Sequence, residues 1–146
     1  MPRMSKTVRI VLVIACAAVI ALSTIVYGLF HGYFDQGDFR VLSVQSSSSG
    51  QLAMVAKRSD HEALNGDEIF VLSGDHVFSP VELKHALHGP SVIFSTDRDC
   101  LTLKWQDPRH LVISCLGGAI VAGEINRQQH HSGEVVFSYT NIASKK

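Results

Sequence analysis

The hydrophobic residues of this chain form one long, uninterrupted run near the N-terminus and a series of short runs after it. The long run covers the 21 residues from Ile10 to Phe30 and contains neither a charged residue nor a proline. An α-helix of that length measures about 31 Å, which matches the hydrocarbon thickness of a bilayer. Because the run is apolar around its whole circumference, it predicts a transmembrane helix over residues 10–30.

The charges on either side of this run indicate its orientation. Three basic residues and no acidic residue precede it, whereas the first charged residues after it are Asp35 and Asp38. The positive-inside rule places the more basic flank in the cytoplasm. We therefore expect a cytoplasmic tail at 1–9, a single span in the lipid bilayer, a juxtamembrane linker at 31–38, and an extracytoplasmic domain after it.

Two other interpretations of the run stay open. A cleaved signal peptide has an apolar core of about 7–15 residues and a small-residue cleavage site, whereas this run is longer and ends in the bulky sequence YGLF. The segment Val13–Cys16 resembles a bacterial lipoprotein box, in which the cysteine carries the lipid. The residues after Cys16 stay apolar as far as Phe30, however, while a lipoprotein usually starts with a polar tether.

From residue 39 onward, the short hydrophobic runs are typical of β-strands. The clearest one alternates Leu101, Leu103 and Trp105 with polar residues, which is the period of a half-buried strand. The sequence lacks the regular alternation of strands and helices that would indicate a parallel sheet. The pattern predicts a mainly β domain over 39–146, an antiparallel sheet or small sandwich. Its seven or eight strands are expected near 39–44, 52–55, 68–72, 91–95, 101–105, 111–116, 119–122 and 135–140.

Two local signals add detail to this domain. The Ser/Gly stretch 46–50 lies between two strand-like runs, which favours a hairpin turn, although such stretches also form flexible linkers. Ser79-Pro80-Val81-Glu82 has the residues of a capping box with proline in the first helical position. This motif predicts one short helix, which would end before Gly89-Pro90 and would need to pack on the sheet to be stable.

Charge restricts the class of partner. The part of the chain after the predicted helix contains 10 basic and 13 acidic residues, a net charge of −3. It has no cluster of basic residues of the kind that binds a phosphate backbone, so we expect no nucleic acid partner.

Two segments resemble known motifs. Ser49–Val55 is similar to the Ser-Pro-Asp-Gly-Lys turn and following strand in β-propeller blades of the TolB type, although the proline is missing. Trp105–Asp107, followed by Leu111–Ile113, is similar to the tryptophan-containing hairpin that often comes after it. The chain has room for about one and a half blades. As a whole it resembles small bacterial single-pass membrane proteins of unknown function with an extracytoplasmic β domain. This resemblance implies a bacterial envelope setting and no particular activity.

Cys100 and Cys115 form a candidate disulfide, since both would lie in an oxidising compartment. They fall on the two arms of one predicted hairpin. A turn of two or four residues would place both side chains on one face, whereas a three-residue turn, 107–109, would place them on opposite faces and prevent a bond. The three-residue turn gives the better apolar face. The expected oxidising compartment therefore favours a disulfide, whereas the pattern of apolar residues favours buried or free thiols.

The remaining candidates for chemistry are histidines and acidic loops. His85 and His88 would share one face of the short helix, and His130 and His131 are adjacent in a loop. Their spacing matches no known metal-binding motif, and solvated surface histidines are the simpler interpretation. The same holds for carboxylates close in sequence, which can pair for acid–base chemistry or bind calcium but usually form a solvated loop. These are Asp60 and Glu62 around His61, and Asp97 and Asp99 around Arg98.

The sequence contains no nucleophile elbow, phosphate-binding loop or dinucleotide motif. The expected function is therefore a membrane-anchored binding or structural module that assists another envelope protein, with no cofactor. The alternative is a small hydrolytic or metal-dependent enzyme, in which at least three of the histidines at 61, 85, 88, 130 and 131 converge with a carboxylate. In a third option the membrane helix itself pairs with another helix, and Ala17 and Ala21 permit close approach.

Overall fold

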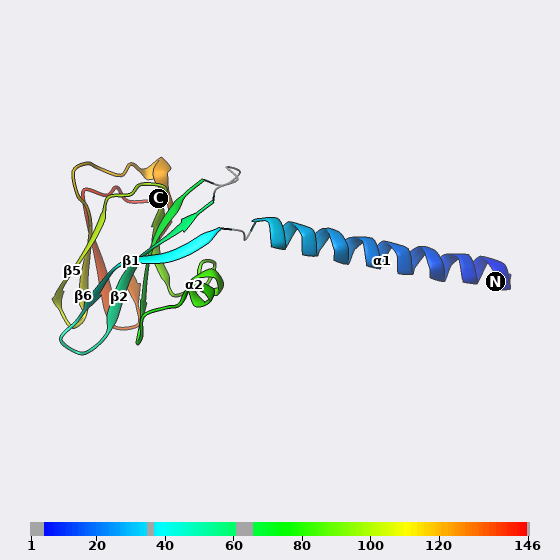
Figure 1. Cartoon of the computed structure of the whole chain (residues 1–146), viewed down its shortest axis with the longest axis horizontal. Helices are drawn as coiled ribbons and strands as arrows, with labels where there is room; N and C mark the ends of the chain where they lie inside the picture. Colours follow the sequence, from blue (N-terminus) through cyan, green and yellow to red (C-terminus); the bar gives the residue numbers. More distant parts are fainter. Residues whose placement is uncertain (1–4, 35–36, 61–65, 146) are drawn as a thin grey trace. The chain divides into compact units, whose positions relative to one another are not determined.

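The computed structural model describes residues 5–34, 37–60 and 66–145. The chain divides into two compact units, residues 1–36 and residues 37–146, and each is described by itself (Figure 1). Parts of the predicted tail and linker, together with His61 and Glu62, lie outside the described residues, whereas Asp60 is described and half-buried.

The first unit contains α1 (Lys6–Phe34), a continuous helix of 29 residues. Its stretch from Lys6 to Leu29 is long and apolar enough to cross a membrane. The helix starts before and ends after the predicted span 10–30, so residues 31–34 of the predicted linker are helical. The prediction ended the helix at Phe30 because the apolar run ends there. The helix continues to Phe34 because no proline follows Phe30 to interrupt the backbone hydrogen bonds.

Two hydroxyl side chains within α1 are satisfied inside the helix. Ser23 and Thr24 each donate a hydrogen bond to the backbone carbonyl four residues earlier, at Val19 and Ile20 respectively. This pairing matters in an apolar solvent, because an unpaired hydroxyl there has no water to bind. Both residues are therefore compatible with a lipid-embedded helix.

The second unit is a two-sheet β domain with one short α-helix, which confirms the predicted mainly β fold class. The larger sheet is fully antiparallel and has the order β1-β2-β3-β4-β7, and the smaller sheet has the order β5-β6-β9-β8, in which β6 and β9 pair in parallel. The larger sheet contains β1 (Asp38–Ser46), β2 (Leu52–Ser59), β3 (Glu68–Gly74), β4 (Val92–Thr96) and β7 (Ile125–Gln128). The smaller sheet contains β5 (Leu101–Asp107), β6 (His110–Cys115), β8 (His131–Ser132) and β9 (Val135–Thr140).

The larger sheet is the middle layer of three. Along β2, Ala53 and Val55 point into the core shared with the smaller sheet, while Met54 and Ala56 point into a second core on the other face. The helix α2 (Pro80–Ala86) covers that second face, and Figure 1 shows it beside β1 and away from β5 and β6. Because both faces are covered, β2, β3 and β4 are hydrophobic or buried almost continuously instead of alternating.

The capping box predicted for α2 is present. The Ser79 hydroxyl accepts a hydrogen bond from the Glu82 N–H, and the Glu82 carboxylate accepts one from the Ser79 N–H. Leu83 is fully buried and Leu87, the C-cap residue, is almost so, and both pack against the larger sheet. This packing supplies the stability that a helix of seven residues lacks on its own.

The predicted turn at 46–50 is also confirmed, because it joins β1 to β2 as a hairpin. Ser47 organises the turn. Its backbone N–H donates to the Gln51 carbonyl, and its buried hydroxyl accepts from the Gln51 N–H. Gly50 has a φ of +85°, a backbone conformation that favours glycine, which explains why a glycine follows the serines of this turn.

One predicted strand is wrong and two strands were missed. In the segment 119–122, only Ile120 makes a bridge, to Ile142, and a short 3-10 helix, η1 (Ala122–Glu124), follows. The chain then forms β7 and β8 between the last two predicted strands, where no strand was expected. The sequence of β7, INRQ, contains a single apolar residue, so its hydrophobic pattern could not reveal a strand that pairs at the edge of the sheet.

The packing of α2 gives a stability test. Replacing Leu83 by alanine is expected to lower the free energy of unfolding by about 2–5 kcal/mol, because the change leaves a cavity in a closed core. Val81 lies on the same helix but is 66% exposed, so Val81→Ala should change it by less than about 0.5 kcal/mol. Guanidinium unfolding of the full chain in lipid nanodiscs, followed by the fluorescence of Trp105, measures both variants. Equal losses in the two variants would contradict the buried position of Leu83.

Candidate functional site

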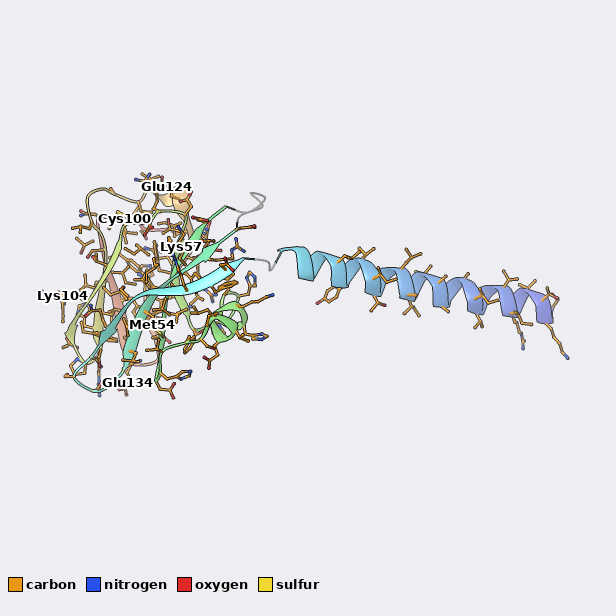
Figure 2. The ribbon with its side chains drawn as sticks, in the orientation of Figure 1. Met54, Lys57, Cys100, Lys104, Glu124 and Glu134 are labelled. Atoms are coloured by element: carbon orange, nitrogen blue, oxygen red, sulfur yellow. A yellow bond between two sulfur atoms is a disulfide. The ribbon has the colours of Figure 1, made fainter. Side chains whose placement is uncertain are left out.

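Cys100 and Cys115 are joined by a disulfide in the structure. Cys115 ends β6 and is buried, whereas Cys100 precedes β5 and is half-buried. Their Cα atoms are 4.8 Å apart. The Leu116 N–H donates to the Cys100 carbonyl over 2.8 Å, so a backbone hydrogen bond lies next to the covalent bond. Figure 2 shows Cys100 at the same end of the domain as Glu124 and opposite Glu134.

The disulfide forms although the pattern of apolar residues predicted that the two cysteines lie on opposite faces. The strands pair with Leu101 opposite Cys115 and Leu103 opposite Ile113, which is the register of the three-residue turn and keeps the expected apolar face. Cys100 lies one residue before β5 begins, however, so the strict alternation of side chains does not apply to it. The chain bends there and brings its sulfur to that of Cys115.

The histidine site of the alternative enzyme hypothesis does not form among the described residues. His85 is exposed on α2, and His131 is exposed in β8. The ring of His130 packs edge-on against that of Tyr139, with the ring centres 5.6 Å apart. Within residues 5–34, 37–60 and 66–145, no group of three or more histidines, cysteines or acids is placed to hold a metal ion, and this includes His88. His61 lies outside the described residues.

The acidic loop around Arg98 is a surface loop in the structure. Asp97, Arg98 and Asp99 are all exposed. The Arg98 guanidinium lies 3.5 Å from the Glu124 carboxylate, and the Thr96 hydroxyl donates to the Glu124 backbone carbonyl. These contacts tie the loop to η1.

A cluster that sequence reasoning missed lies between β3 and α2. Its centre is His76, whose two ring nitrogens both face carboxylates. Nδ1 lies 2.7 Å from Asp75 Oδ1, and Nε2 lies 2.9 Å from Glu82 Oε1. The second oxygen of Glu82 accepts hydrogen bonds from the Ser79 N–H and hydroxyl, at 2.8 and 2.7 Å. The His76 ring also packs on Phe78, with the ring centres 5.0 Å apart.

The contacts in this cluster shift the protonation of its members. The hydrogen bonds of His76 to Glu82 and then to Asp75 raise the pKa of the imidazole above its ordinary value. The hydrogen bonds from the Ser79 backbone and hydroxyl, and then from His76, lower the pKa of Glu82 to about 2. The hydrogen bond from His76 also lowers the pKa of Asp75. All three shifts favour an imidazolium held between two carboxylates.

This arrangement does not match nucleophilic catalysis. The Ser79 hydroxyl donates to Glu82 and not to His76, and a carboxylate with a pKa of about 2 is a weak general base near neutral pH. Asp75 also lines a shallow, open hollow of about 460 Å³ with Gly74 and the β1–β2 turn residues Ser49, Gly50 and Gln51. The sequence signal for the cluster was an Asp-His pair three residues before a capping box, a spacing that matches no motif.

Comparison of the chain with protein-family models, with curated proteins and with solved structures finds no match. The two segments that resemble TolB-type motifs both fall on hairpins, β1–β2 and β5–β6.

The disulfide gives a second stability test. Replacing Cys100 and Cys115 together by alanine is expected to lower the free energy of unfolding by about 3 kcal/mol, because a cross-link across about 15 residues restricts the unfolded chain. Guanidinium unfolding of the full chain in nanodiscs under non-reducing conditions measures the loss. Cys16→Ala leaves the disulfide in place and serves as the control. An unchanged unfolding midpoint in the double variant would contradict a structural role for the bond.

Proposed function

We propose that this chain is a membrane-anchored binding or structural module of the bacterial envelope, with its β domain outside the cytoplasm. The observation that carries the proposal is the disulfide in a domain that follows an apolar helix. Structural disulfides are rare in reducing compartments, so the bond supports an extracytoplasmic domain. The basic flank before the helix supports the same orientation independently. The bacterial setting rests on the resemblance to small bacterial membrane proteins.

Cysteine labelling in intact cells tests this orientation. In a Cys16→Ser background, a membrane-impermeant maleimide should label Cys100 and Cys115 in intact cells only after reduction. Labelling that requires permeabilisation of the inner membrane would place the domain in the cytoplasm and overturn the proposal. Extraction of membranes with alkaline carbonate separates the two leading interpretations of α1, because an anchored chain stays in the membrane and a chain released by signal cleavage does not.

The surface that best fits a partner is the outer edge of β1. Edge strands present backbone groups that can pair with another strand, and proteins usually protect them. The other edge of the larger sheet, β7, is bordered by the segment 143–145. There the Gln128 side chain bonds the Ala143 carbonyl and the Lys145 N–H. In the smaller sheet, the edge strand β8 has only two residues, and the other edge strand, β5, is joined to β1 by the hydrogen bond from Trp105 to the Gln45 carbonyl.

Only part of β1 is protected in a comparable way. Phe39 and Val41, near its start, pack into the core beneath α2. Near its end, the Trp105 indole N–H donates to the Gln45 carbonyl over 3.2 Å and joins β1 to β5. Between these points, Leu42 and Val44 are 40% and 37% exposed, and the register shifts at Leu42. We infer that an extended segment of a partner protein pairs along this middle part of β1 and covers both side chains.

Photo-crosslinking in cells tests this surface. A photoreactive amino acid at Leu42 should give a discrete crosslinked product, whereas the same residue at Val136, which is exposed on β9, should not. Leu42→Arg should reduce recovery of that partner in a detergent pull-down, and Val136→Arg should leave it unchanged. Equal crosslinking at both positions, or a pull-down unaffected by Leu42→Arg, would show that this edge is not the binding surface.

A further inference from the structure

His76 occupies an unusual position for an exposed histidine, because a carboxylate faces each of its ring nitrogens. Asp75 is its chain neighbour at the end of β3, and Glu82 belongs to the first turn of α2. The imidazole therefore bridges the end of a strand and the start of a helix. A charged imidazole donates from both nitrogens and can satisfy both carboxylates at once.

The neutral ring cannot maintain both contacts. A neutral imidazole has one N–H donor and one acceptor nitrogen, and the acceptor would face a carboxylate oxygen that also only accepts. One of the two contacts, at 2.7 and 2.9 Å, must then open. The capping box does not depend on this change, because Ser79 bonds the other oxygen of Glu82. Loss of the proton is thus expected to loosen the loop without unfolding α2.

We propose that His76 is a pH-sensitive latch that fastens the loop 75–79 to the first turn of α2 through both contacts when the imidazole is charged and loosens it when the imidazole is neutral and keeps only one of them. The groups that face the ring are Asp75 from the loop, Glu82 from α2 and the Phe78 side chain. On the side of the β1–β2 turn, the hollow next to Asp75 is lined by the uncharged residues Ser49, Gly50 and Gln51. The carboxylates of Asp75 and Glu82 are therefore the charged groups that govern the protonation of His76.

The pH range follows from the direction of each shift. The raised pKa of His76 means that its contribution is complete below about 6.5 and is lost as pH rises through the folded value. The lowered pKa of Glu82 means that its contribution is complete above 4.5 and is lost as pH falls through about 2. The latch is therefore closed in mildly acidic solution and opens as the solution becomes alkaline.

Opening the latch would change the surface of the domain. The His76 ring covers one side of Phe78, which is half-buried against the core beneath α2. Val77 and Val81, on either side of the capping residue, are 53% and 66% exposed. Release of the loop uncovers more of Phe78 next to these two side chains. The device thus makes an apolar patch on this face larger at high pH and smaller at low pH.

Hydrogen exchange of the full chain in lipid nanodiscs tests the latch. Exchange is measured by mass spectrometry at about pH 5.5 and about pH 8.5, on either side of the histidine range, and corrected for intrinsic rates. Peptides reporting on the loop 75–79 should lose protection at the higher pH, while peptides from β2, β3 and α2 should not. His76→Gln should show the low protection at both values. His85→Gln, on the exposed side of α2, should keep the wild-type response.

A second variant separates the latch from a general effect on folding. Gln can replace Glu in a capping box, so Glu82→Gln should keep α2 folded but move the loss of protection to lower pH, because the imidazolium loses one carboxylate partner. Three results would overturn the proposal: equal protection of the loop 75–79 at both pH values in the wild type, an unchanged response in His76→Gln, or a transition that does not move in Glu82→Gln. A loss of protection across the whole domain would also overturn it.

Discussion

The architecture of the domain depends on the burial of its larger sheet on both faces. Residues 53–56 alternate between two cores, so each face of β2 needs its own cover. The smaller sheet covers one face, and α2 covers the other with Leu83 and Leu87. A seven-residue helix is not stable in isolation, and it is present because the second face would otherwise be exposed to water. The capping box of Ser79 and Glu82 then determines where this helix begins.

Polar and covalent contacts fix how the layers meet at their margins. Trp105 bonds the Gln45 carbonyl and joins the two sheets at one corner. The disulfide closes the end of the β5–β6 hairpin. Tyr139, whose pKa burial raises, donates its hydroxyl to the Gln129 carbonyl and packs between the rings of Phe94 and His130. These contacts join different strands and loops at the edges of the layers, so the interior stays apolar while the margins determine alignment.

Sequence reasoning succeeded where the signal was local. The apolar run predicted α1, the capping box predicted α2, and the alternation at 101–105 predicted β5 with its apolar face. It failed where a neighbour in space decided the outcome. β7 is a strand because β4 pairs with it, although its own sequence is polar. Cys100 reaches Cys115 through a bend outside the strand, which alternation could not reveal. The His76 cluster forms because the loop folds back and brings His76 next to Glu82 of α2, and no sequence spacing predicts this contact.

The parallel pairing of β6 with β9 has a consequence for how the domain is made. β9 lies between β6 and β8 in the smaller sheet, yet about 20 residues separate it from β6 in the sequence. A chain growing from its N-terminus can form the β1–β2–β3 meander early from neighbouring segments, but the smaller sheet has to wait until synthesis has passed Thr140. Until then the inner edge of β6 and one face of the larger sheet have no partner. This nascent intermediate is the stage most exposed to chaperones, proteases and aggregation.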